Sequence, residues 1–154
     1  MNIDDYKLRI AQATPLQLVI INYEMAIGYI DEALKNEDGF ERGISKARES
    51  LFLLTSSLDL KISVAQDLYT VYEYIGRLLT SALFGKGARR AKAAADSKSM
   101  LEELLEGWLT VNESEAGATS AEANAPQVFA GLTYTRGGEL SEYVNQNENR
   151  GYKA

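Results

Sequence analysis

Residues 14–35 read TPLQLVIINYEMAIGYIDEALK, and this stretch decides the fold. Its polar residues recur at helical spacing and share one narrow stripe, made of Gln17, Glu24, Gly28, Asp31 and Lys35. The apolar residues cover roughly 260° of the circumference at 100° per residue, whereas an ordinary surface helix has an apolar face only somewhat wider than about 100°. The stretch therefore predicts a helix whose excess apolar surface must be buried, and a partner protein is one candidate for that role.

The start of this helix carries its own signal. Thr14 precedes Pro15, and Gln17 follows at the third helical position. Such a Thr-x-x-Gln pattern forms a capping box in which each side chain accepts a hydrogen bond from the other residue's backbone amide, and proline is favoured at the first helical position. The sequence therefore predicts that the helix begins at Pro15.

Outward from this helix, the same periodicity predicts helices over about residues 40–58, 62–83 and 88–111, separated by glycine-containing breaks at Gly39 and at Gly85-Lys86-Gly87. Ile3, Tyr6 and Ile10 are spaced by three and four residues and predict a short additional N-terminal helix or arm. Because four helices with short links pack as neighbours, we expect an all-α, antiparallel up-and-down four-helix bundle.

The domain organisation expected from these patterns has four parts: an N-terminal arm or cap over residues 1–14, the helical bundle over 15–111, a flexible linker over 112–126, and a tail over 127–154. The linker reads NESEAGATSAEANAP and has no apolar periodicity. The tail carries isolated apolar residues among glycines. Two interpretations of it stay open: disorder, or occupation of a groove on the same chain by Phe129, Leu132 and Tyr134.

Composition excludes several functions. The chain of 154 residues has no cysteine and no histidine, so disulfides, thiolate nucleophiles, histidine-dependent triads and most zinc sites are impossible. Its net charge of −6 disfavours nucleic acid as a partner. No uninterrupted apolar stretch is long enough for a membrane span and no leader pattern is present, which predicts a cytoplasmic protein without membrane insertion. We expect no catalysis, no cofactor and no metal.

Three places in the sequence resemble the FliS family of flagellin-specific export chaperones. The first is an N-terminal aromatic followed by a helix-opening Thr-Pro and then by Leu and Tyr-acidic-x-small-apolar, here Tyr6, Thr14-Pro15, Leu18, Tyr23-Glu24 and Ala26-Ile27. The second is a Leu-Asp that closes the next helix, here Leu58-Asp59. The third is a run matched by Ala65, Asp67, Leu68, Val71, Tyr72 and Tyr74. The likeness spans about residues 6–110, and Asn22 stands where the family usually has an apolar residue.

The resemblance implies a small helical chaperone that wraps the helical C-terminal end of flagellin. It would prevent premature polymerisation in the cytoplasm and present the subunit to the flagellar export gate for type III export. A flagellin segment that folds as it binds would bury on the order of 1,000–3,000 Å² of surface. The rival interpretation is a self-associating helical-bundle adaptor or sensor, a homodimer with no client.

Helix-in-groove recognition is the expected binding mode. The predicted client-binding residues are Leu18, Ile21 and Ile27 on the first long helix and Leu68, Val71, Tyr72, Ile75 and Leu79 on the third. The resemblance adds Tyr6 and Ile10, which would lie across an apolar groove in the free protein and be displaced by the client. The alternative for each of these residues is an ordinary place in the bundle core.

Overall fold

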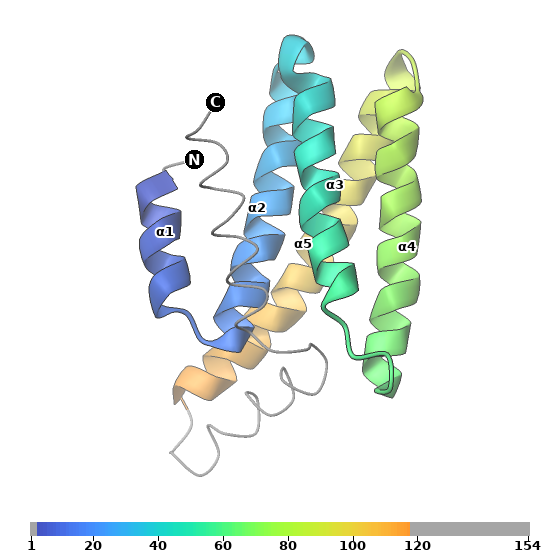
Figure 1. Cartoon of the computed structure of the whole chain (residues 1–154). Coiled ribbons are helices and arrows are strands. Elements are labelled where there is room, and N and C mark those ends of the chain that lie inside the picture. Colours follow the sequence, from blue (N-terminus) through green and yellow to red (C-terminus); the bar gives the residue numbers. More distant parts are fainter. Residues whose placement is uncertain (1–2, 118–154) are drawn as a thin grey trace.

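Five α-helices and one short 3-10 helix follow one another in the part of the chain that the computed structural model describes, residues 3–117, with no strand among them. Their bounds are α1 Ile3–Gln12, α2 Pro15–Lys35, η1 Glu37–Gly39, α3 Phe40–Ser56, α4 Ser63–Phe84 and α5 Ala88–Gly117. In the bundle α2 packs on α3, α3 on α4, α4 on α5 and α5 back on α2, while α1 lies outside against α2 (Figure 1). The expected all-α bundle with a short N-terminal helix is confirmed.

The capping box at the start of α2 is also confirmed. The backbone amide of Gln17 donates to the Thr14 hydroxyl over 3.2 Å, and the backbone amide of Thr14 donates to the Gln17 side-chain oxygen over 3.0 Å. Two amides that the helix cannot satisfy internally are therefore paired. This fixes the point at which the chain turns from α1 into the bundle.

The end of α5 differs from the expectation. The sequence predicted that a linker begins at Asn112, whereas α5 continues to Gly117 and includes residues 112–117. Adding residues to an existing helix costs little, and Glu113, Glu115 and Ala116 are good helix formers. The boundary between bundle and linker is corrected accordingly, and the predicted tail over residues 127–154 lies outside the described residues.

The excess apolar surface of α2 is buried within this single chain. Its buried residues point to several sides of the helix and include Leu16, Val19, Ile21, Met25 and Ile30. Because α1, α3 and α5 each contact α2, no partner protein is needed to cover these side chains. The apolar excess of α2 therefore reflects a central position in the bundle, which was the alternative interpretation.

Two polar contacts cross the core. The hydroxyls of Tyr23 on α2 and Tyr72 on α4 are hydrogen-bonded to each other, and the ring centroids lie 6.2 Å apart. The buried amide of Asn22 donates to the backbone carbonyl of Ser50 on α3 over 3.0 Å. Buried polar groups are stable only when they are hydrogen-bonded. Asn22, which stands where the family usually has an apolar residue, therefore has a hydrogen-bond partner on α3.

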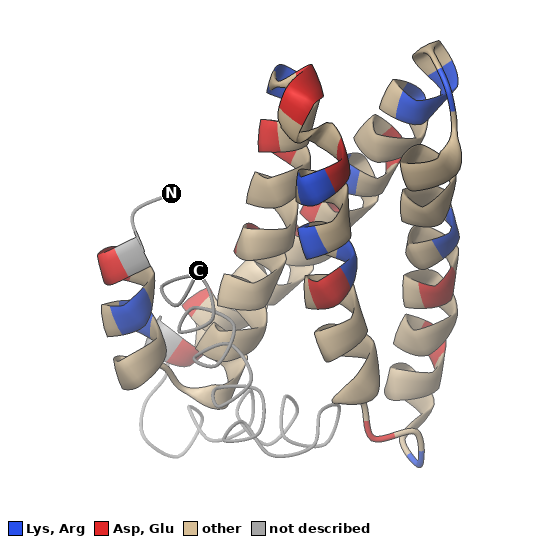
Figure 2. Cartoon of the chain, turned by 45° about the horizontal axis from the view of Figure 1, so that its top comes forward, with Lys and Arg blue, Asp and Glu red and all other residues tan. Residues whose placement is uncertain are grey.

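Charged residues lie on the outer sides of the helices. Figure 2 shows acidic and basic residues interspersed along the bundle and on α1. Within α2 the polar stripe is used for attachment, because Glu24 pairs with Arg9 of α1 and Asp31 pairs with Lys98 of α5. The narrow stripe noted in the sequence is therefore where two neighbouring helices are fastened.

The close approach of α2 and α3 yields a stability prediction. A Cβ added at Gly43 would lie 2.8 Å from both the Ala33 Cβ and the Tyr29 carbonyl oxygen. We expect Gly43→Ala to lower the free energy of unfolding by about 1–3 kcal/mol in urea titrations, in spite of alanine's higher helix propensity.

The matched control is Gly107 on α5, where an added Cβ meets no described atom within 4 Å. Gly107→Ala should raise the free energy of unfolding by up to about 1 kcal/mol. If both variants were stabilised to the same extent, α2 and α3 would not be held at the distance described.

Candidate functional site

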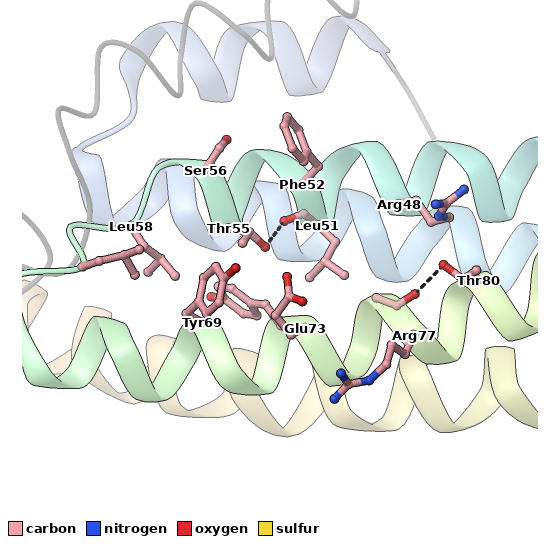
Figure 3. Close-up of a pocket in the computed structure, with 13 residues that line it drawn as sticks. Arg48, Leu51, Phe52, Thr55, Ser56, Leu58, Tyr69, Glu73, Arg77 and Thr80 are labelled. Carbon is pink, nitrogen blue, oxygen red and sulfur yellow. Dashed lines mark hydrogen bonds between the residues drawn. The ribbon is translucent and has the colours of Figure 1, made fainter.

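An open groove of about 590 Å³ runs between α3 and α4. One wall is formed by Arg48, Leu51, Phe52, Thr55 and Ser56 of α3, the end by Leu58 and Leu60 of the α3–α4 link, and the other wall by Tyr69, Tyr72, Glu73, Gly76, Arg77 and Thr80 of α4. Figure 3 shows Leu51, Thr55, Tyr69 and Glu73 between the two helices. In this view Phe52 and Ser56 project from the far side of α3, and Arg77 projects from the far side of α4.

The end of the groove nearest the α3–α4 link is apolar. Phe52 is 65% exposed, Leu60 49% and Tyr69 38%, while Leu51 and Tyr72 are buried beneath them. The hydroxyl of Thr55 donates to the carbonyl of Leu51 in its own helix over 2.8 Å, so it does not require a partner in the groove. Exposed aromatic and aliphatic side chains grouped around a hollow are typical of protein-binding surfaces.

The opposite end of the groove is charged. Arg48 on α3 and Arg77 on α4 flank it, and Glu73 lies between Tyr69 and Arg77 along α4 (Figure 3). Among the described residues, none of these three side chains forms an ion pair. The groove thus offers an apolar section, then a carboxylate, then two guanidinium groups available to a ligand.

A second candidate surface lies beneath α1. Ile10 is only 2% exposed and packs into the core cluster, with half-buried Tyr6 beside it. Arg9 Nη1 lies 2.7 Å from Glu24 Oε2 of α2, and its guanidinium carbon lies 5.5 Å from the centroid of the Tyr6 ring. The hydrogen bond to Glu24 raises the pKa of Arg9, and burial together with the Glu24 charge raises the pKa of Tyr6. The ion pair between Arg9 and Glu24 therefore joins α1 to α2, and Ile10 anchors α1 in the core cluster.

The structure distributes the client-binding residues expected from the sequence over several sites. Buried residues among them are Ile10, Leu18, Ile21, Tyr72, Ile75 and Leu79, and the half-buried ones are Tyr6, Ile27, Leu68 and Val71. Tyr72 lines the α3–α4 groove, and Ile21 lines a smaller hollow of about 410 Å³ between α1, α2 and α5. Ile10 of α1 belongs to the core cluster, and the others lie in or against that cluster.

Sequence reasoning missed the contribution of α3 and of the α3–α4 link. Phe52 follows the buried Leu51 in α3 and was not among the client-binding residues expected from the sequence. A large aromatic side chain beside a helix seam signals a second apolar surface. Leu60 lies in the α3–α4 link, where apolar residues alternate with polar ones, and carries the same signal.

Comparison with protein-family models identifies a match to the family described as flagellar protein FliS, over residues 4–115. The chain belongs to the FliS family. The matched range contains the four bundle helices almost completely and most of α1. Comparisons with curated proteins and with solved structures returned no match.

FliS is a family of flagellar chaperones and not of enzymes, so membership implies a protein partner. No helix within residues 3–117 has both the length and the apolar content to cross a membrane. The same residues contain no group of three acidic, histidine or cysteine side chains that could hold a metal ion. The features of the described chain that can engage a partner are therefore surfaces such as the α3–α4 groove.

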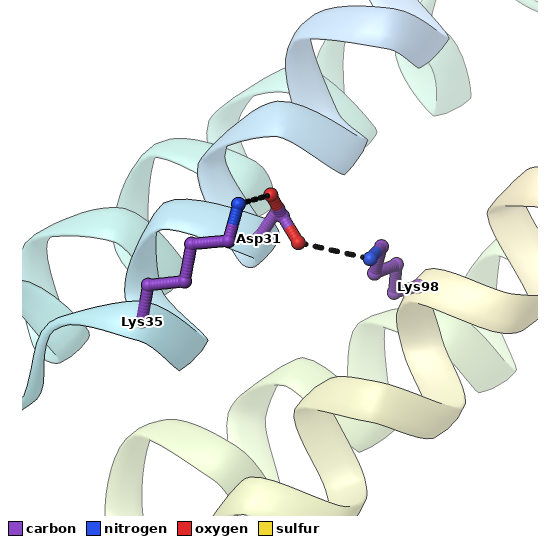
Figure 4. A network of polar contacts seen from close by, with 3 residues as sticks. All are labelled: Asp31, Lys35 and Lys98. Atoms are coloured by element: carbon purple, nitrogen blue, oxygen red, sulfur yellow. Dashed lines mark hydrogen bonds and ion pairs between the residues drawn. The ribbon is translucent and has the colours of Figure 1, made fainter.

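On the side of this FliS-family bundle that lies away from the groove, an ion-pair cluster joins α2 to α5. Figure 4 shows the carboxylate of Asp31 on α2 between two lysines. Its oxygens lie 2.7 Å from Lys35 Nζ in the same helix and 2.9 Å from Lys98 Nζ on α5. These hydrogen bonds lower the pKa of Asp31, and the bond from Lys98 raises the pKa of that lysine. The contact thus fastens α2 to α5.

The lowered pKa of Asp31 predicts how stability depends on pH. Because the folded-state pKa lies below the unfolded value, the contact stabilises the fold above about pH 4 and is lost as the pH falls through the folded pKa. We expect Asp31→Asn to lower the free energy of unfolding at about pH 7 and to differ less from wild type at about pH 3, measured by urea titration.

The control is Asp96→Asn, which removes an exposed pair with Lys92 inside α5 and leaves the α2–α5 contact in place. It should change stability little at either pH. A deficit of Asp31→Asn that is equal at both pH values would contradict a role of the ionised carboxylate.

Proposed function

We propose that this FliS-family chain is a cytoplasmic export chaperone that binds the helical C-terminal segment of flagellin. The observation that carries the proposal is the α3–α4 groove, an open apolar surface in a flagellar chaperone family. A flagellin subunit held there cannot polymerise before export, and the complex would deliver it to the flagellar type III export gate.

The shape of the groove suits a short amphipathic helix. Tyr69 and Thr80 mark its two ends on α4 and lie roughly 16 Å apart along the helix axis at about 1.5 Å per residue. This length matches about three turns of a bound helix, whose apolar residues at spacings of three and four would contact Phe52, Leu60 and Tyr69. Arg48 and Arg77 favour acidic residues at the end of the client helix that lies between them.

The surface under α1 is the second part of the proposal. A helix of ten residues is marginal in isolation, so α1 can leave α2 at low cost. Displacement of Tyr6 and Ile10 would uncover the α2 residues around Ile21, and with them the expected contacts of Leu18 and Ile27. Ile75 and Leu79 would support the client from beneath, as core residues, while Leu68 and Val71 would contact it at the other flank of α4.

The groove predicts a specific loss of client affinity. We expect Phe52→Ala combined with Tyr69→Ala to weaken the binding of a synthetic peptide of the flagellin C-terminal segment about tenfold, or about 1.4 kcal/mol, in isothermal titration. The control is Phe84→Ala, because Phe84 is 76% exposed and does not line the groove.

Equal affinity of the groove variant and the control would rule out the groove as the client site. Light scattering of wild type at several concentrations distinguishes a chaperone from the rival function, a self-associating bundle. Self-association would be supported if wild type formed a homodimer and did not bind the peptide, and if the Phe52 and Tyr69 variant dissociated.

The α1 cover predicts a change in the association rate. Ile10→Ala removes a buried side chain and should loosen α1 by about 2 kcal/mol or more, so that the uncovered state becomes more populated and the client peptide binds about tenfold faster in stopped-flow measurements. Leu8→Ala on the same helix is the control, because Leu8 is 60% exposed. An unchanged rate in Ile10→Ala would show that α1 does not gate client binding.

A further inference from the structure

The topology of the bundle places the end of α5 at the same end of the bundle as the apolar end of the groove. Since neighbouring helices are antiparallel, α3 and α5 run in the same direction, and the α3–α4 link lies at the same end of the bundle as Gly117 (Figure 1). This link carries Leu58 and Leu60, which form the apolar end of the groove. The last turns of α5 lie near α1 and the start of α2, where Leu109 and Asn112 line a hollow with Gln12 and Gln17. The sequence continues from Ala118 to Ala154, so this remainder starts at the same end of the bundle as the groove's apolar end but on the α1–α2 side.

The segment after α5 is long enough to reach the groove. Residues 118–128 span up to about 36 Å when extended, and about 18 Å on average as a flexible chain. Packed helices lie about 8–10 Å apart, so the path from the end of α5 across two helices to the groove is at least roughly 20 Å, which the extended segment can span. The first apolar residues after this segment, Phe129 and Leu132, can therefore lie at Leu58 and Leu60.

The order of chemical groups along the C-terminal sequence complements the order along the groove. From the α3–α4 link onward the groove presents apolar residues around Tyr69, then the carboxylate of Glu73, then Arg48 and Arg77. The sequence presents Phe129, Leu132 and Tyr134, then Arg136, then Glu139 and Glu142. Laid along the groove from its apolar end, the segment pairs apolar with apolar, Arg136 with Glu73, and the two glutamates with the two arginines.

We propose that residues 129–142 of this chain occupy the α3–α4 groove when no client is bound. The groove then has an intramolecular ligand whose effective concentration is in the millimolar range. This ligand covers exposed apolar side chains and must be displaced by any client. The competition of this segment with flagellin rests on the function proposed above for the groove. The docking of the segment in the groove does not depend on that function.

The absence of cysteine allows a direct test on the full chain. Single substitutions Thr133→Cys and Ser141→Cys, each labelled with a nitroxide, place a paramagnetic group at either end of the segment. We expect the label at position 133 to broaden NMR signals of Leu58 and Leu60, and the label at 141 to broaden those near Arg48 and Arg77. Broadening spread evenly, absent, or centred on α1 and α2 would overturn the proposal.

A charge exchange provides the matched control. Glu139→Lys with Glu142→Lys should reduce the broadening from position 141 at least threefold, and adding Arg48→Glu with Arg77→Glu should restore it. Failure of the restoration, in a variant with unchanged circular dichroism, would overturn the pairing. A mixture of labelled protein with unlabelled isotope-enriched protein should show no broadening, and broadening there would assign the groove to a second copy instead.

The client measurement separates the two proposals. Addition of the flagellin C-terminal peptide should abolish the broadening, and Phe129→Ser with Leu132→Ser should raise peptide affinity at least threefold. Broadening that persists with saturating peptide would support docking of the segment and contradict the groove as the client site. Peptide binding in the groove without any broadening in the free protein would support the function and overturn the intramolecular ligand.

Discussion

Burial of α2 on several sides is the constraint on which the arrangement of the other helices depends. Its apolar residues are covered by α1, α3 and α5, and its few polar residues fix those neighbours, with Glu24 holding α1 and Asp31 holding α5. Gly43 permits the close approach of α3. A helix with this much apolar surface is stable only inside such a shell, so the positions of its neighbours follow from its sequence.

The same constraint determines where a binding surface can form. The faces of α3 and α5 that pack on α2 are buried, whereas α3 and α4 meet at the side of the bundle away from α1, where Phe52, Leu60 and Tyr69 stay exposed. Tyr72 lies under the groove and is hydrogen-bonded through its hydroxyl to Tyr23 of α2. The groove floor is therefore connected to the most buried part of the fold, which keeps it in place whether or not a ligand is bound.

The elements of this fold could be predicted from sequence because their signals are local. Thr14, Pro15 and Gln17 specify the start of α2, and glycines mark the breaks before α3 and after α4. The groove could not be predicted in this way, because apolar periodicity does not distinguish a central helix from one with an open face. Leu18 and Ile75 are core residues and Phe52 is exposed, and this difference arises only when the helices are packed.

An exposed apolar groove creates a hazard for a protein that waits for its client, because it also attracts other copies and unrelated chains. The bundle helices cannot close it, since α2 and α5 are engaged on the other side. A cover must therefore come from a part of the chain that can leave cheaply. The ten-residue helix α1 meets this requirement on α2, where Ile10 is buried and Arg9 pairs with Glu24. For the α3–α4 groove, the cover that we propose is the segment of residues 129–142, which follows α5 at the same end of the bundle as the α3–α4 link and carries complementary groups in the matching order.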